Sequence, residues 1–161
     1  MVAAQVTIAR LPQDFERWDD LLDLIMRCFA YMDGVIDPPS SAHRLTPANL
    51  RDKAKDEVCF IATLEGRLVG CIFAAERSDA FYVGKLAVDD SARGLGIGRA
   101  LMLAAERHAI AQGKPVLELQ TRIELATNHA TFAKLGFVEF ERTAHDGFDR
   151  PTSITFRKTL T

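Results

Sequence analysis

Apolar and polar residues follow two different periods along the chain, and the period separates helices from strands. From Asp14 to Gly34 the large apolar side chains recur at helical spacing, which predicts a helix with Asp14 as its N-cap. Residues 57–88 instead form three apolar runs, separated by Gly66 and by the turn at 78–79. These connections are too short for crossovers, so the runs are predicted to be strands of an antiparallel meander.

The second half of the chain alternates helices with strands. A long helix is predicted after Gly96 and ends at Gly113. Its predicted inner face consists of Ile97, Leu101, Ala104, Ala105, His108 and Ala111. The strand 116–121 is reached through this helix, so it should run parallel to 80–88. The other predicted elements are strands at 6–11, 137–143 and 152–160 and helices that begin at Thr46 and near 126. This order predicts one α/β domain over residues 1–161 with a mixed sheet.

Composition narrows the classes of partner. The chain has 161 residues, 48% of them hydrophobic, and a net charge of −2, so neither nucleic acid nor an anionic membrane is an expected partner. No apolar run approaches the roughly 18 residues of a membrane span, and no signal peptide is recognisable. The three cysteines are an odd set, which favours buried thiols and a reducing, cytoplasmic location. No group of residues has metal-ligand spacing, so no metal is expected.

The segment DDSARGLGIGRALM, residues 89–102, places three glycines directly before the long helix. A helix N-terminus exposes unpaired N–H groups and favours anions, and glycines there remove side chains that would keep a phosphate away. A flexible turn is the alternative. A Walker A loop is excluded, because Arg99-Ala100 follows the last glycine where Lys and Ser or Thr are required. A dinucleotide fingerprint is disfavoured, because the loop follows an antiparallel meander.

Two motifs carry a family resemblance. Residues 93–98, Arg-Gly-Leu-Gly-Ile-Gly, match the R/Q-x-x-G-x-G/A signature of the GNAT N-acetyltransferase superfamily. Residues 135–137, Leu-Gly-Phe, match the point where a later helix of that family enters a strand. The order of elements fits from about residue 6 to 160. The resemblance implies a GNAT-like mixed, mostly antiparallel central sheet of six to seven strands, flanked by about four helices.

The resemblance also implies a donor and its site. Acetyl-CoA would be the co-substrate, and its pyrophosphate would lie on Arg93, Gly94, Leu95, Gly96, Ile97, Gly98 and Arg99. Its pantetheine arm would pair with the strand end formed by Leu86, Ala87 and Val88. Asn128 would contact the coenzyme, or serve instead as a helix N-cap. The acceptor would be an amine of a small molecule or peptide, and a homodimer is a further expectation from the family.

One position departs from the family pattern. Phe132 stands where many members have a tyrosine that protonates the leaving thiolate, and the resemblance implies that Phe132 contacts the coenzyme. Either another group supplies that proton, for which Tyr31 is the candidate, or the thiolate leaves unassisted.

Three further polar residues are candidates for the reaction. Glu118 on the strand 116–121 is the candidate general base, with a salt-bridged strand residue as the alternative. Arg122, just past that strand, could bind an acceptor carboxylate or lie on the surface. His145 is assigned to the acceptor site. The leading hypothesis is direct acetyl transfer to a primary amine in a ternary complex, and the alternative is a non-catalytic acyl-CoA sensor of the same fold.

Overall fold

A seven-stranded sheet organises residues 5–160, the part of the chain that the computed structural model describes. The strands are β1 (Val6–Arg10), β2 (Val58–Leu64), β3 (Arg67–Glu76), β4 (Ala80–Val88), β5 (Val116–Arg122), β6 (Val138–Thr143) and β7 (Ser153–Thr159). Their spatial order is β1-β2-β3-β4-β5-β7-β6, and only β4 and β5 pair in parallel. The predicted mixed, mostly antiparallel sheet is confirmed, as is the parallel course of β5.

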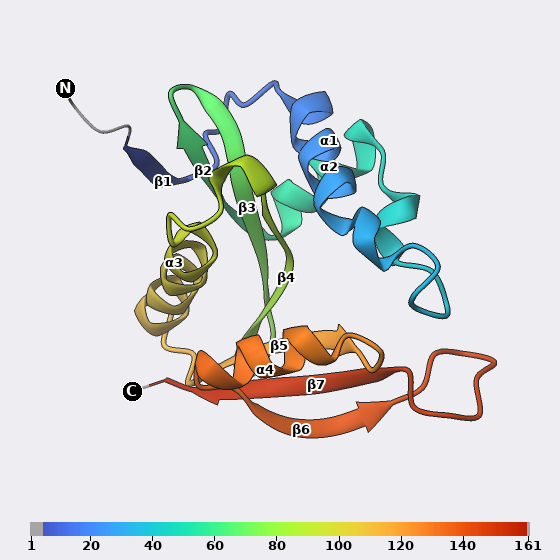
Figure 1. Ribbon diagram of the computed structural model, residues 1–161. Coiled ribbons are helices and arrows are strands. Elements are labelled where there is room, and N and C mark those ends of the chain that lie inside the picture. Colours follow the sequence, from blue (N-terminus) through green and yellow to red (C-terminus); the bar gives the residue numbers. More distant parts are fainter. Residues whose placement is uncertain (1–4, 161) are drawn as a thin grey trace.

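Four α-helices within residues 5–160 cover the two faces of the sheet (Figure 1). They are α1 (Trp18–Phe29), α2 (Pro47–Asp56), α3 (Ile97–Ala111) and α4 (Ala126–Lys134), with short 3-10 helices η1 (Ala30–Met32), η2 (Ser41–Arg44) and η3 (Asp90–Ala92). Helix α3 packs with Ile72 of β3 on one face, whereas α1 packs with Phe73 of β3 on the other. None of the helices described here is long and apolar enough to span a membrane.

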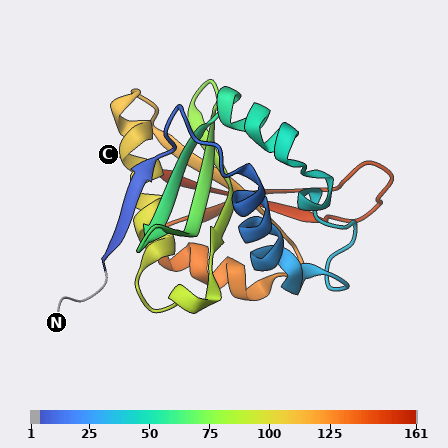
Figure 2. The same cartoon turned by 90° about the horizontal axis from the view of Figure 1, so that it is seen from above.

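The sheet opens where its two parallel strands separate. β4 and β5 pair at only three positions, the last being Tyr82 with Glu118. Beyond that point β5 continues along β7 to Arg122, while β4 continues along β3 to Val88. Figure 1 shows β5, β7 and β6 turning across the direction of β3 and β4. Figure 2 shows the β6–β7 loop on the same side of the molecule as the segment after α1.

The first helix begins later than the sequence predicts. Its N-cap is Arg17 and not Asp14, and residues 13–14 form a turn instead. The apolar spacing extends upstream because Phe15 packs edge-on against Trp18, with ring centroids 4.9 Å apart, although it lies outside the helix. The second helix begins as predicted. Thr46 accepts a hydrogen bond from the Asn49 backbone N at 3.1 Å, which caps that helix.

The inner face of α3 is rotated from the predicted one. Ala111 is exposed, whereas Met102 and Ala109 are buried along with Leu101 and Ala105. The difference follows from the sheet beneath, because α3 lies along β3 and β4 and so buries an i, i+4 row. His108 packs at the margin of this row, with its ring centroid 5.2 Å from that of Phe81.

Candidate active site

The turn before α3 depends on two glycines with left-handed backbone. Gly94 has φ +84°, and Gly96, the N-cap residue, has φ +73°. A Cβ at either position would meet no atom within 4 Å, so conformation and not crowding calls for glycine here. Gly98 lies inside α3, where an added Cβ would be 3.6 Å from Val88 Cγ2. The turn at Gly94 and Gly96 is therefore open, and it lies directly before the N–H groups of α3 that have no partner within the helix.

The two ends of this turn are fixed by burial. Ala92 before it is 1% exposed and Ile97 after it is 2% exposed, whereas Leu95 between them is 54% exposed. The Arg93 guanidinium folds back onto Asp90, with Nη2 2.7 Å from Oδ1. Arg99 is exposed on the first turn of α3. The turn is thus an exposed backbone loop held between two core residues.

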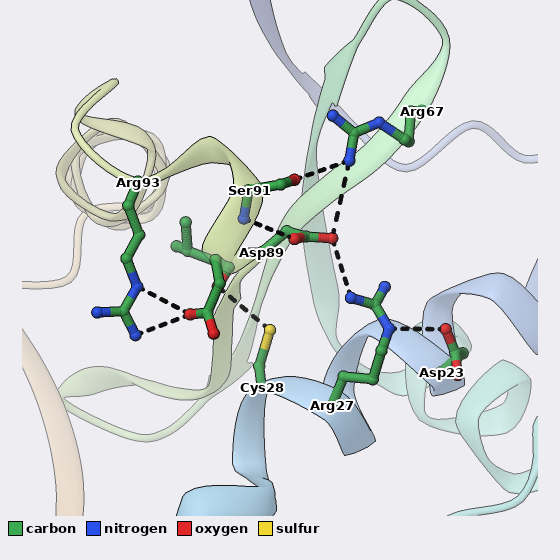
Figure 3. A network of polar contacts seen from close by, with 9 residues as sticks. Asp23, Arg27, Cys28, Arg67, Asp89, Ser91 and Arg93 are labelled. Atoms are coloured by element: carbon green, nitrogen blue, oxygen red, sulfur yellow. Dashed lines mark hydrogen bonds and ion pairs between the residues drawn. The ribbon is translucent and has the colours of Figure 1, made fainter.

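A buried carboxylate secures the approach to the turn (Figure 3). Asp89 accepts hydrogen bonds from the Ser91 backbone N at 2.9 Å and from Arg27 Nη1 at 3.0 Å. These contacts lower the pKa of Asp89, and the Ser91 N–H is the largest cause. Nearby, the Cys28 thiol donates to the Val88 carbonyl at 3.2 Å. Asp89 and its partners tie α1 to the end of β4, a role that sequence reasoning missed.

β4 carries a bulge before its end. Between the pairs Cys71–Ala87 and Phe73–Gly84, β3 has one residue and β4 has two, Lys85 and Leu86. At this bulge Lys85 has φ +51°, a left-handed conformation that is unusual for a residue with a side chain. Since β5 has already diverged, the edge of β4 at 83–88 has no ladder partner on that side among the described strands.

A cavity of about 380 Å³ lies where β4 and β5 separate. Its lining comes from six parts of the chain: the segment from α1 to α2, the second half of β4, α3, the end of β5, α4, and the β6–β7 loop. Of the residues that the sequence singled out, it includes Tyr31, Leu86, Arg122, Asn128, Phe132 and His145. Ala87, Val88, Glu118 and residues 93–99 lie outside its lining. Tyr82 of β4 also lines it.

Comparison with known proteins decides the family. The model of the Acetyltransferase (GNAT) family matches residues 18–137, which include the glycine turn and Leu135-Gly136-Phe137. The chain belongs to this family. An IAA acetyltransferase from Azospirillum brasilense is 34% identical over 137 residues, 83% of this chain and 85% of its own. Membership makes the chain an N-acetyltransferase that uses an acyl-CoA donor, and it removes the dinucleotide interpretation of the turn.

Solved structures agree on the GNAT fold. An acetyltransferase of the GNAT family from Staphylococcus aureus Mu50 aligns with 98% of this chain and 100% of its own, with a TM-score of 0.76 and 15% identity. A GNAT acetyltransferase from Elizabethkingia anophelis with acetyl-CoA bound covers 96% of this chain and 98% of its own, with a TM-score of 0.68 and 15% identity. At such identities these likenesses show the fold alone.

Two predicted site residues of this GNAT chain meet across the cavity. Asn128 Nδ2 donates a hydrogen bond to Tyr31 Oη at 3.0 Å, although 97 positions separate them. The N-cap alternative for Asn128 is wrong, because α4 already begins at Ala126 with Leu125 as its N-cap. Tyr31 is 55% exposed and lies on η1. Phe132, one turn further along α4, stacks edge-on against Phe137 and brings no polar atom.

Glu118 is placed away from the cavity. Its carboxylate lies 3.1 Å from Arg157 Nε, and Arg157 is its direct neighbour on β7. The two side chains are 19% and 23% exposed. The salt-bridged alternative therefore describes the observed position, and a base role would require this ion pair to open.

Arg122 and His145, the two candidate acceptor residues, both line the cavity. Arg122 donates to the carbonyls of Pro38 and Pro39 at 2.7 and 3.0 Å, so it binds backbone and orders the segment before η2. Burial lowers its pKa. The His145 ring contacts Thr152 Oγ1, and burial, with Arg122 nearby, lowers the pKa of this histidine. A neutral imidazole is expected there at pH 7.

Sequence reasoning missed Lys85, the bulge residue. Its Nζ donates to Ser41 Oγ at 2.8 Å and lies 5.9 Å from the centre of the Phe29 ring. Burial, more than neighbouring cations, lowers its pKa to about 8. The sequence did contain a signal, because Lys85 is the one charged residue in the strand 80–88. Residues 5–160 hold no group of three potential metal ligands.

Proposed function

We propose that the chain transfers an acetyl group from acetyl-CoA to a primary amine by direct attack within a ternary complex. The observation that carries this proposal is the open left-handed turn at Gly94 and Gly96 on the N-terminus of α3. Such a turn suits a pyrophosphate, because backbone N–H groups and the helix dipole both favour anions. Residues 93–99 would bind it, and the acceptor is an amine of a small molecule or peptide.

The pantetheine arm is proposed to lie along the unpaired edge of β4. Leu86, Ala87 and Val88 would offer it backbone groups, as an edge strand does to an added peptide. The thioester would then reach the cavity between β4 and β5. There the amine nitrogen attacks the carbonyl carbon, the C–S bond breaks with its electron pair on sulfur, and the amine loses a proton.

Tyr31 is the proposed proton donor for the thiolate. Its Oη accepts a hydrogen bond from Asn128, which leaves its own hydrogen free to be donated into the cavity. Phe132 cannot serve, since it has no hydroxyl. The demand on this donor is modest, because a thiol with a pKa of about 8.5 is a fair leaving group. Glu118 could act as base only through displacement of Arg157, so we assign proton uptake from the amine to water in the cavity.

Calorimetry of acetyl-CoA binding tests the turn. Gly96→Glu places a side chain and a negative charge where the pyrophosphate would lie, and we expect no measurable binding. Gly113→Glu is the matched control, because Gly113 has φ +76° with equally open surroundings at the other end of α3. Equal affinity in both variants would refute the assignment of the turn. Binding without thiol release against a broad panel of amines would instead support the acyl-CoA sensor.

A further inference from the structure

The cavity is lined by cationic side chains and by no carboxylate among the described residues. Lys53, Lys85 and Arg122 all reach it. Lys53 is balanced by Glu57, with Nζ 2.6 Å from Oε2. The Arg122 guanidinium is held by neutral carbonyls, as described above. The acceptor end of the cavity therefore carries positive charge that the lining itself does not offset.

Lys85 is the clearest case of this imbalance. No Asp or Glu within residues 5–160 forms an ion pair with its Nζ, whose polar contact is the Ser41 hydroxyl at 2.8 Å. A partly buried ammonium without a counter-ion is unfavourable, and its lowered pKa of about 8 follows from that burial. Lys53, Arg44 and Arg122 lower the pKa further, and Glu57 opposes them.

The backbone at Lys85 is also strained. A residue with a side chain at φ +51° costs free energy that glycine would avoid, and Gly84 stands directly beside it. The conformation places an ammonium group in the cavity immediately before Leu86–Val88, the strand end assigned to the pantetheine arm. The unpaired cation and the proposed thioester position are thus neighbours along β4.

We infer that the acceptor is an amine that also carries a carboxylate, an amino acid in the general sense, and that Lys85 binds this carboxylate. The inference rests on the proposed acetyl transfer and adds the acceptor's chemical class. A carboxylate next to Nζ supplies the missing counter-ion and forms a charge-assisted hydrogen bond. A polyamine in the same place would meet like charges. Because Lys85 is so close to the assigned thioester position, few bonds should separate the acceptor's amine from its carboxylate.

Thiol release from acetyl-CoA across matched acceptors tests the inference. The panel contains the standard L-amino acids, β-alanine, spermidine and tyramine. The amino acid with the highest kcat/KM is then compared with its amide and with its decarboxylated amine. These three compounds differ only at the carboxylate. We expect the amino acid to have the highest kcat/KM of its series and the polyamine to be poor.

Three variants assign the effect to Lys85. Lys85→Met should lower kcat/KM for the amino acid roughly ten- to hundredfold and leave that for the amide nearly unchanged, since only the amino acid loses a charged partner. Lys85→Arg should restore most of the loss. Lys134→Met, an exposed lysine outside the cavity lining, is the control. Calorimetry should give all variants the same affinity for acetyl-CoA.

The outcomes separate the two proposals. Preference for spermidine or tyramine, equal losses for amino acid and amide in Lys85→Met, or bound acetyl-CoA with no amino acid acetylated would each overturn the carboxylate inference while the coenzyme assignment stands. A wild-type chain that does not bind acetyl-CoA would overturn the proposed function, and the inference with it.

Discussion

The proposed coenzyme side and the proposed acceptor side of the site are built in different ways. On the coenzyme side, Asp89, Ala92 and Ile97 are 7%, 1% and 2% exposed and lie within nine positions of one another. On the acceptor side, Tyr31 and Val35 are 55% and 53% exposed, and the segment is held by hydrogen bonds from distant residues. A short motif anchored by buried residues thus forms the proposed donor site, whereas loops that meet only in the folded chain form the proposed acceptor site.

The largest expected effect is on stability, from removing Asp89. Asp89→Ala leaves the Ser91 N–H without its acceptor and removes one of the two carboxylates that bind Arg27, which keeps Asp23 at 2.8 Å. The free energy of unfolding should therefore fall by about 3 kcal/mol. Asp37→Ala is the matched change on the acceptor side, where the carboxylate is 68% exposed and 3.4 Å from Arg150 Nη2. That variant should change stability by no more than about 0.5 kcal/mol. Urea unfolding of both variants at pH 7 measures the two changes in the free energy of unfolding. Equal losses would contradict the difference between the two sides.

The stability that Asp89 contributes should depend on pH, which sharpens the same contrast. Its pKa is lower in the folded chain than the ordinary value of 3.8, so the folded state favours the ionised form. The resulting stabilisation is fully present above the unfolded pKa and is lost as the pH falls through the lower, folded value. The stability difference between wild type and Asp89→Asn should therefore stay constant from pH 7 to 5 and shrink below about pH 4. A difference that grows on acidification would contradict this account.

Tyr31→Phe is expected to have the next largest effect, on turnover. Loss of the hydroxyl that Asn128 orients should lower kcat roughly ten- to hundredfold. This loss is small for the removal of a general acid, because a thiolate leaves readily. The Kd of acetyl-CoA should not change. Steady-state kinetics with calorimetry checks both, and an unchanged kcat would mean that the thiolate leaves unassisted.

Arg122→Met should act on the acceptor alone. The guanidinium orders Pro38 and Pro39, so its loss is expected to raise the acceptor KM about tenfold through a less ordered segment. Acetyl-CoA affinity should stay the same, because the glycine turn lies outside the cavity lining to which Arg122 belongs. A weaker affinity for acetyl-CoA would show that the two sides are coupled.

The same division explains what the sequence could predict. The order of elements along the chain, the start of α2 and the glycine turn each follow from local patterns, because apolar period, a capping Thr and missing side chains act over a few residues. The contact between Tyr31 and Asn128 joins segments 97 positions apart, and no local pattern encodes it. Lys85 was missed because a bulge, not strand alternation, decides where its side chain lies. The displaced start of α1 reflects Phe15, whose packing on Trp18 continues the apolar spacing outside the helix.

Glu118→Gln is expected to have the smallest effect, and it decides between the two interpretations of this residue. As a partner of Arg157 between β5 and β7, Glu118 contributes a partly exposed ion pair, so its loss should cost about 1 kcal/mol or less. Since glutamine keeps the shape, kcat should fall by less than threefold if Glu118 does not take part in proton transfer. A general base would instead cost a hundredfold or more, and this loss should shrink at low pH, where a wild-type carboxylate would itself be protonated. A pH profile of kcat for wild type and variant distinguishes these outcomes, because only a base that titrates in the complex shifts the acidic limb.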